Sequence, residues 1–156
     1  MRARDLVEDY PLVRLSDDAL DAARLIADQR RPAVVVVDEE GRPVTVLPAS
    51  QVLSFSVPGY VQEDPSLSRV YDEKGGADVC IRNLSRRSVE EVLPPAERRY
   101  ELPVAPGNAT VMECAATMAR LRTPLVVVTE DDGAIRGVVT ASHLLQVILD
   151  ASGSQA

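Results

Sequence analysis

The sequence is poor in aromatic residues, and its charge balance is acidic. It contains no Trp, one Phe and four Tyr among 156 residues, which argues against an aromatic platform that stacks the bases of single-stranded nucleic acid. The formal net charge of −7 is opposite in sign to the clustered Lys and Arg that bind a phosphate backbone. We therefore expect no nucleic-acid partner.

Long apolar runs and reactive side chains are also scarce. No apolar stretch approaches the roughly 20 residues that cross a bilayer, and the start, MRARDLVEDY, lacks the apolar core of a signal peptide. We therefore expect a cytoplasmic protein without direct membrane insertion. Cys80 and Cys114 have no ligand-like spacing and are expected to be small, reduced core residues. With His143 as the one histidine, we expect no metal site, no catalytic residue and no enzymatic activity.

One stretch of the chain occurs twice. Residues 30–53 read RRPAVVVVDEEGRPVTVLPASQVL, and residues 122–145 read RTPLVVVTEDDGAIRGVVTASHLL. Pro32 and Gly41 of the first stretch match Pro124 and Gly133 of the second at one constant spacing, without a gap. An internal repeat is a stronger guide to fold class than any local pattern. The sequence therefore predicts an α/β fold built from two copies of one unit.

Each copy predicts the order strand, helix, strand, strand, helix. The valine-rich runs have the pattern of strands covered on both faces, and acidic turns ending in Gly41 and Gly133 join them to the next strand. Ser16 is expected to cap the first helix. The predicted strands are residues 11–15, 33–37 and 43–47, then 102–105, 125–129 and 135–140; the predicted helices are residues 17–30, 48–55, 110–121 and 141–150.

The residues between the copies predict a helical insertion. Short helices are expected at 65–71 and 77–84, with Lys74-Gly75-Gly76 as the break between them, and Ser88 and Glu91 have the spacing of a capping box. The insertion packs on the repeats or forms a partner surface. We divide the chain into repeat 1 (1–57), the insertion (58–87), repeat 2 (88–151) and a disordered tail (152–156).

The proline, apolar run, acidic turn and glycine, followed by RGVVTASHLL at residues 136–145, make this unit resemble the CBS domain. The pair resembles a tandem CBS module, also called a Bateman module. The resemblance implies two repeats packed with pseudo-two-fold symmetry, and clefts that bind AMP, ADP, ATP, S-adenosylmethionine or NAD. It also implies a homodimer that regulates a transporter or an enzyme. The threonine and aspartate positions of the family motif are Thr140 and His143 in copy two, but Pro48 and Gln51 in copy one.

The chemistry of such a corner follows from its backbone. A side chain at a strand-to-helix junction lies beside the amides of a helix N-terminus, which favour phosphate. Thr140 is expected to donate to a phosphate oxygen, and His143, one turn later, to contact ribose or phosphate. The predicted ligand-binding residues are Thr123, Pro124, Leu125, Thr140, Ser142 and His143 in copy two, and Arg31, Pro32, Ala33, Ser50 and Gln51 in copy one.

Basic pairs stand out in this acidic chain, at residues 30–31, 86–87 and 98–99. Such pairs usually lie in solvent, and we interpret them so. Arg31 is the exception, because it directly precedes Pro32 at the predicted corner and could hold a phosphate with two hydrogen bonds.

Two hypotheses about function follow. The first is a stand-alone regulatory or sensor protein that requires no cofactor and binds an adenosyl-type nucleotide in at least one cleft. The alternative is a module without a ligand, whose function is dimerisation or docking on a transporter or enzyme. Pro48, Gln51 and His143 favour the alternative, while the intact strand end from Gly137 to Thr140 favours the first hypothesis.

Overall fold

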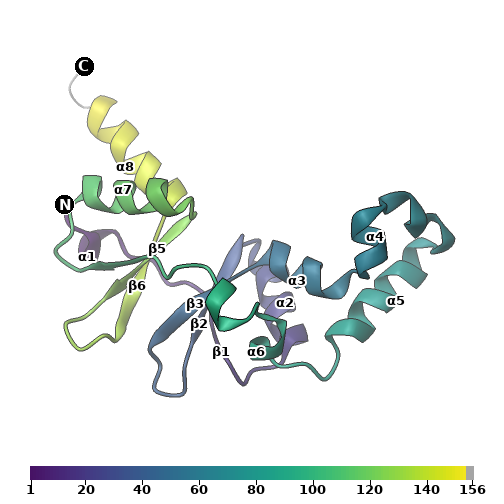
Figure 1. Cartoon of the computed structure of the whole chain (residues 1–156). Coiled ribbons are helices and arrows are strands. Elements are labelled where there is room, and N and C mark those ends of the chain that lie inside the picture. The colour runs from purple at the N-terminus through teal and green to yellow at the C-terminus, as the bar shows by residue number, and fades with distance from the viewer. Residues whose placement is uncertain (154–156) are drawn as a thin grey trace. The chain divides into compact units, whose positions relative to one another are not determined.

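A computed structural model of the chain describes residues 1–153. Its contacts divide the chain into two compact units, which are described separately. Unit 1 comprises Met1–Tyr10, Val37–Thr45 and Tyr100–Ala156; unit 2 comprises Pro11–Val36 and Val46–Arg99. The chain forms two three-stranded sheets, ordered β1-β2-β3 and β4-β5-β6 (Figure 1). The predicted α/β fold with two copies of one unit is confirmed.

Unit 1 contains the sheet of the second repeat. Strand β4 (Val104–Pro106) runs parallel to β5 (Leu125–Thr129), and β5 pairs antiparallel with β6 (Ile135–Thr140). Helix α7 (Val111–Leu121) contacts β5, and α8 (Ala141–Gly153) contacts β6. The core between them is built from side chains that are at most 7% exposed: Cys114, Met118, Val126, Val128, Val139 and Leu144. The remaining three residues of the chain, 154–156, lie outside the described part.

The N-terminal segment belongs to this same unit. Helix α1 (Ala3–Leu6) contacts β4 and β6, and Leu6 is 1% exposed in the core of unit 1. The Glu8 amide donates to the Val138 carbonyl at 2.8 Å, and the Val138 amide donates back to the Glu8 carbonyl at 3.2 Å. A Cβ at Gly137 would lie 2.7 Å from Val7 Cβ, so glycine permits this close approach. Residues 1–10, predicted as the start of repeat 1, thus pack on the sheet of repeat 2.

Unit 2 holds the first sheet, apart from the hairpin residues that group with unit 1. Its elements are β1 (Leu12–Arg14), α2 (Ala19–Gln29), β2 (Ala33–Val37), β3 (Pro43–Pro48) and α3 (Ala49–Ser56). All five residues of β2 are buried, as the valine run predicts. The first residues of repeat 2 in turn belong to unit 2: α6 (Val89–Val92) packs on α2 and α3. The two repeats thus exchange their first segments.

The helix ends and turns follow from their local chemistry. Gly41 and Gly133 have φ of 80° and 89°, which confirms the predicted turns. The predicted cap Ser16 is wrong, because the Asp18 side chain accepts from the Leu20 amide at 2.8 Å and starts α2 two residues later. Ser88 and Glu91 form the predicted capping box of α6.

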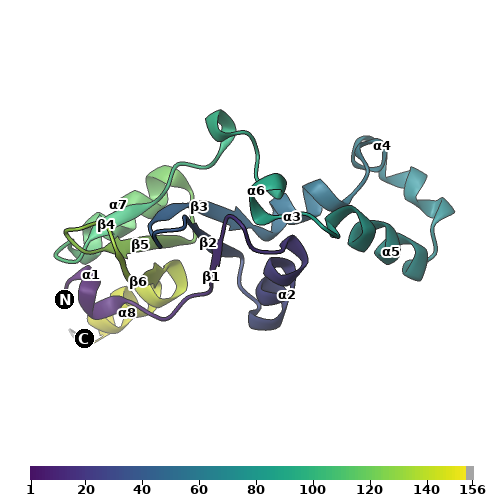
Figure 2. The ribbon, with the colours of Figure 1, turned by 90° about the horizontal axis from the view of Figure 1, so that it is seen from below.

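The insertion is helical, but its break is not where the glycines are. Its elements are α4 (Gly59–Glu63), the 3₁₀ helix η1 (Pro65–Val70) and α5 (Glu73–Leu84). Another 3₁₀ turn, η2 (Ala96–Arg98), follows α6 beyond the insertion. Gly75 and Gly76 lie inside α5, so the prediction of a break at Lys74-Gly75-Gly76 is wrong. The Asp72 side chain accepts from the Gly75 amide and caps the helix, and this cap offsets the low helix propensity of glycine. Figure 2 shows α4 and α5 side by side.

Helix α8 also extends further than expected. It reaches Gly153, the last described residue, because no proline or glycine interrupts it after Ala141. Ser152 and Gly153, assigned from the sequence to a disordered tail, are therefore helical, and the rest of that predicted tail lies outside the described residues.

Candidate functional site

The strand-to-helix corner of unit 1 brings the predicted residues of copy two together. Strand β6 ends at Thr140, whose register partner on β5 is Leu125, and α8 begins at the next residue. The Ala141 amide donates to the Pro124 carbonyl at 2.8 Å, and Thr123 Oγ1 donates to the Leu125 carbonyl at 3.2 Å. Ser142 Oγ lies 3.3 Å from Thr140 Oγ1. The Thr123–Leu125 segment therefore lies directly against the start of α8.

Thr140 is at the centre of this corner and is 7% exposed. Its hydroxyl donates to Glu8 Oε1 at 2.8 Å and accepts from the His143 amide at 3.2 Å. A hydroxyl has one proton to donate, and here Glu8 receives it. Thr140 would therefore have to release Glu8 before it could donate to a ligand phosphate.

His143 faces the same carboxylate. Its Nδ1 lies 3.3 Å from Glu8 Oε1, and the two side chains are 38% and 34% exposed. Nδ1 itself is shielded from solvent and forms no hydrogen bond of regular geometry within residues 1–153. The two side chains therefore face each other at ion-pair distance without a regular hydrogen bond. Glu8 Oε2 has no hydrogen-bond partner in the described part of the chain.

Glu8 is the site residue that sequence reasoning does not find. It is separated from Thr140 by 132 positions and lies in a segment that has no motif. The one hint in the sequence is Gly137, which stands in a strand where copy one has Thr45. An isolated glycine in a strand suggests that another backbone approaches closely, and here that backbone is the segment of Glu8. Glu8 places a carboxylate next to His143, the motif position where the resemblance leads us to expect aspartate.

The corresponding corner of unit 2 has a different composition. The Ala49 amide donates to the Pro32 carbonyl at 3.0 Å, so residues 31–33 lie against the start of α3. Pro48 occupies the N-cap of α3 and offers no side-chain cap. The Gln51 amide nitrogen donates to the Val92 carbonyl at 2.9 Å. Arg31 is half-buried and Ser50 is exposed. Among the predicted residues of this corner, no carboxylate is present and the Gln51 amide is already bonded to the backbone.

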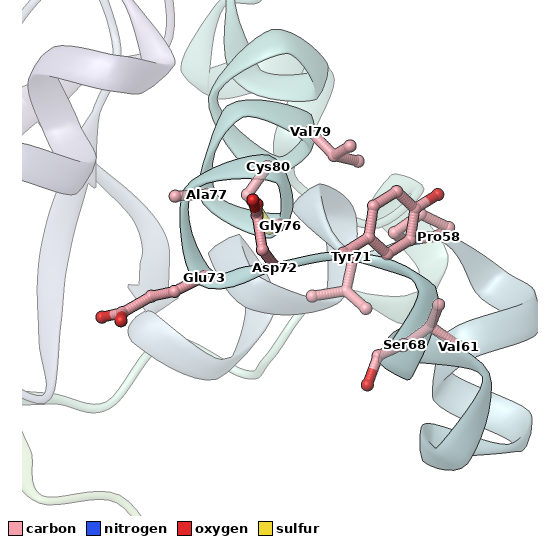
Figure 3. Close-up of a pocket in the computed structure, with 11 residues that line it drawn as sticks. Pro58, Val61, Ser68, Tyr71, Asp72, Glu73, Gly76, Ala77, Val79 and Cys80 are labelled. Atoms are coloured by element: carbon pink, nitrogen blue, oxygen red, sulfur yellow. The ribbon is translucent and has the colours of Figure 1, made fainter.

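The insertion contains a separate, mostly apolar pocket of about 350 Å³ between α4, η1 and α5. Figure 3 shows the Tyr71 ring beside Pro58, with Ala77, Val79 and Cys80 presented by α5. The Tyr60 and Tyr71 hydroxyls lie 2.5 Å apart, and this hydrogen bond raises the pKa of Tyr60 above its ordinary value. None of the predicted ligand-binding residues lines this pocket.

A second apolar groove, of about 290 Å³, lies along α7 and α8 in unit 1. Its lining combines small and large apolar residues: Ala115, Met118, Ala119, Ala141, Leu144, Leu145 and Ile148. Leu145 is 58% exposed. The groove is thus an apolar helix surface open to solvent.

Within residues 1–153, no group of three or more His, Cys, Asp or Glu side chains could hold a metal ion. No helix among the described residues is long and apolar enough to cross a bilayer.

Comparisons with known proteins agree with the repeat. Residues 3–56 and 89–150 each match the family model of the CBS domain. The chain is 47% identical to a CBS domain-containing protein of unknown function from Kribbella flavida, with a TM-score of 0.85, covering 96% of this chain and 99% of that one. The comparison with curated proteins gave no match.

More distant structures share the fold. CBSX2 in complex with AMP is 16% identical with a TM-score of 0.68, covering 97% of this chain and 98% of that one. The CBS domain of a CBS domain-containing membrane protein from Sphaerobacter thermophilus is 22% identical with a TM-score of 0.68, covering 94% and 86%. At these identities the similarity concerns the fold.

Proposed function

Because this chain belongs to the CBS domain family, we propose that it is a regulatory protein that binds an adenosyl-type nucleotide at the strand-to-helix corner of unit 1. The ligand class is AMP, ADP, ATP, S-adenosylmethionine or NAD. The observation that carries the proposal is the cluster of Thr140, His143 and Glu8, which joins a hydroxyl, an imidazole and a carboxylate at the N-terminus of α8. The AMP complex of a structural neighbour supports the ligand class.

Each member of the cluster has a role toward such a ligand. Thr140, once it releases Glu8, donates its hydroxyl proton to a phosphate oxygen. A carboxylate accepts hydrogen bonds from the two hydroxyls of a ribose, and charge-assisted bonds of this kind are about twice as strong as neutral ones. Glu8 Oε2 has no partner among residues 1–153 and is positioned for that role. The amides at the start of α8 offer positive potential to a phosphate, and His143 lies beside them, since its own amide donates to Thr140 Oγ1. Regulation then requires that the ligand bind two states of the protein with different affinity.

Thermal unfolding against a panel of these nucleotides tests the proposal. A ligand at 100 times its dissociation constant should add about 2.7 kcal/mol to the free energy of unfolding. Thr140→Ala should remove the shift, while Thr117→Ala, which removes a hydroxyl bonded within α7, should keep it. Calorimetric titration separates lost binding from lost stability. If no nucleotide shifts the midpoint at millimolar concentration, adenosyl binding is abandoned.

A second function is favoured by the apolar groove of α7 and α8: self-association into a homodimer that docks on a transporter or an enzyme. The corner of unit 2 supports this alternative, because Pro48 and the bonded Gln51 leave little for a ligand. Sedimentation velocity tests it with Leu145→Glu in the groove and Met112→Glu outside it, at a side chain that is 76% exposed. If Leu145→Glu dissociates a dimer and Met112→Glu does not, the groove is the dimer interface. A wild type that is monomeric contradicts this second function.

A further inference from the structure

A hollow of about 530 Å³ in unit 2 is lined by three arginines. It lies between α3, the end of α5 and the connection to α6. Its lining residues are Phe55, Arg82, Asn83, Ser85, Arg86 and Arg87. No acidic residue contributes to that lining, although the whole chain carries a net charge of −7. The hollow shares no residue with the corner at Thr140.

The positive charge of this hollow is only partly balanced. Arg87 forms an ion pair with Glu91 at 3.2 Å, and its guanidinium lies 5.9 Å from the centre of the Phe55 ring. Arg82 and Arg86 have no carboxylate partner within residues 1–153. Like charges held close together repel one another. An anion placed between them would relieve this repulsion and gain charge-assisted hydrogen bonds.

Two polar side chains of the lining, Asn83 and Ser85, are fixed by hydrogen bonds to the backbone, while the three arginines are exposed. Asn83 Nδ2 donates to the Ser56 carbonyl and Ser85 Oγ donates to the Ile81 carbonyl, both at 2.8 Å. Arg86 has φ of 60°, a left-handed conformation that favours glycine over a residue with a side chain. Arg86 directly follows the C-cap of α5, where a left-handed residue is common and glycine is the usual choice.

We propose that this hollow binds a small organic phosphate. Arginine holds a phosphate with paired hydrogen bonds, and Arg82 and Arg86 bring two guanidinium groups to the lining. The volume lies in the range of roughly 300–1,000 Å³ found for small-molecule sites, so it has room for more than the phosphate group. Phe55 supplies an aromatic wall for the organic part, beneath the Arg87 guanidinium.

Calorimetric titration at fixed ionic strength tests this assignment with phenyl phosphate, inorganic phosphate and phenol. The wild type should bind phenyl phosphate more tightly than inorganic phosphate, and should not bind phenol. Arg86→Gly should weaken phenyl phosphate binding by about tenfold or more, the scale of one lost charge-assisted contact. This variant keeps its fold, because glycine suits the backbone at residue 86.

Arg30→Gly is the matched control. Arg30 has φ of 51° at the end of α2, so this change removes the same charge from a similar backbone conformation outside the hollow. It should leave phenyl phosphate affinity within about twofold of the wild type, since long-range charge effects are screened by salt. Equal weakening by the two variants, or no wild-type binding up to about ten millimolar, overturns the proposal. Equal affinity for phenyl and inorganic phosphate overturns the organic part of the assignment.

Discussion

Gly137→Ala tests whether the N-terminal segment is held against β6 as described. Replacing a glycine by alanine inside a strand normally raises the free energy of unfolding by about 0.5–1 kcal/mol. At this position, however, the added Cβ would lie 2.7 Å from Val7 Cβ and 3.3 Å from both Val7 Cγ1 and the Glu8 carbonyl oxygen. The segment around Val7 and Glu8 must therefore move, and the substitution should lower the free energy of unfolding instead of raising it.

The size of the loss follows from what the movement breaks. Two backbone hydrogen bonds join Glu8 and Val138, and a third bond joins Glu8 to Thr140. At about 1 kcal/mol net for each bond, complete detachment costs about 3 kcal/mol, and a partial shift costs less. After subtracting the gain from alanine, we expect about 2 kcal/mol of destabilisation. That loss lowers the midpoint by roughly 5 °C in a chain of this length.

Urea unfolding and amide hydrogen exchange measure this effect, the latter at the Glu8 and Val138 amides, which should lose protection first. Gly59→Ala is the matched control, because a Cβ there meets no atom within 4 Å. In the double variant Val7→Gly should cost less than it costs alone, because it removes the Cβ that clashes, whereas Val7→Ala keeps that Cβ; the single variant is the reference, since Val7 packs against the core of unit 1. An alanine variant as stable as the wild type would refute the packing argument.

Three further predictions concern local features. The Ser88 amide, and then Arg87, lower the pKa of Glu91. The ionised Glu91 therefore stabilises the fold above the ordinary carboxyl pKa, and this stabilisation is lost as the pH falls through the lowered pKa. Glu91→Gln should make the free energy of unfolding less dependent on pH in this acid range. Burial, and then Glu113, raise the pKa of Cys114, so alkylation at pH 8 should be slow at Cys114 and faster at the half-buried Cys80. Arg122→Gly, at φ of 51°, should raise the free energy of unfolding by about 1 kcal/mol in a urea titration.

The repeat accounts for most of what the sequence predicts correctly. Valine runs, turn glycines and prolines act within a few residues, so the β2 and β5 strands and their turns follow from local pattern. The prediction of a break at Gly75 is wrong because it rests on the low helix propensity of glycine alone. The Asp72 cap, three residues earlier, sets the start of α5 instead.

The motif predicts where only some residues of the candidate corner lie, and their role in ligand binding stays a prediction. Thr140 and His143 follow from the position of the strand end, but Glu8 reaches them through an exchange of the first segment between repeats. That exchange depends on the packing of Leu6 into a core made mostly by residues about a hundred or more positions away. A long-range contact of this kind leaves no periodic pattern in the sequence.

Glu8 has two opposite effects on a nucleotide, and a single substitution separates them. As an acceptor for ribose hydroxyls it would strengthen binding of any adenosyl ligand. As a negative charge 2.8 Å from the Thr140 hydroxyl, it would repel a phosphate at the start of α8, and the repulsion would grow with the number of phosphates. Glu8→Gln keeps the shape of the side chain and removes the charge.

If the ribose role dominates, this variant should weaken adenosine, AMP and ATP by a similar factor of about ten, since a neutral amide is a poorer acceptor than a carboxylate. If repulsion dominates, the same variant should bind ATP more tightly than the wild type and leave adenosine unchanged. Calorimetric titration of the three ligands distinguishes the two patterns. Asp9→Asn is the control, because it removes an adjacent, exposed charge. Since Glu8 already bonds Thr140 and faces His143, we expect the first pattern; tighter ATP binding by the variant would show that Glu8 blocks the phosphate position and that the ribose lies elsewhere.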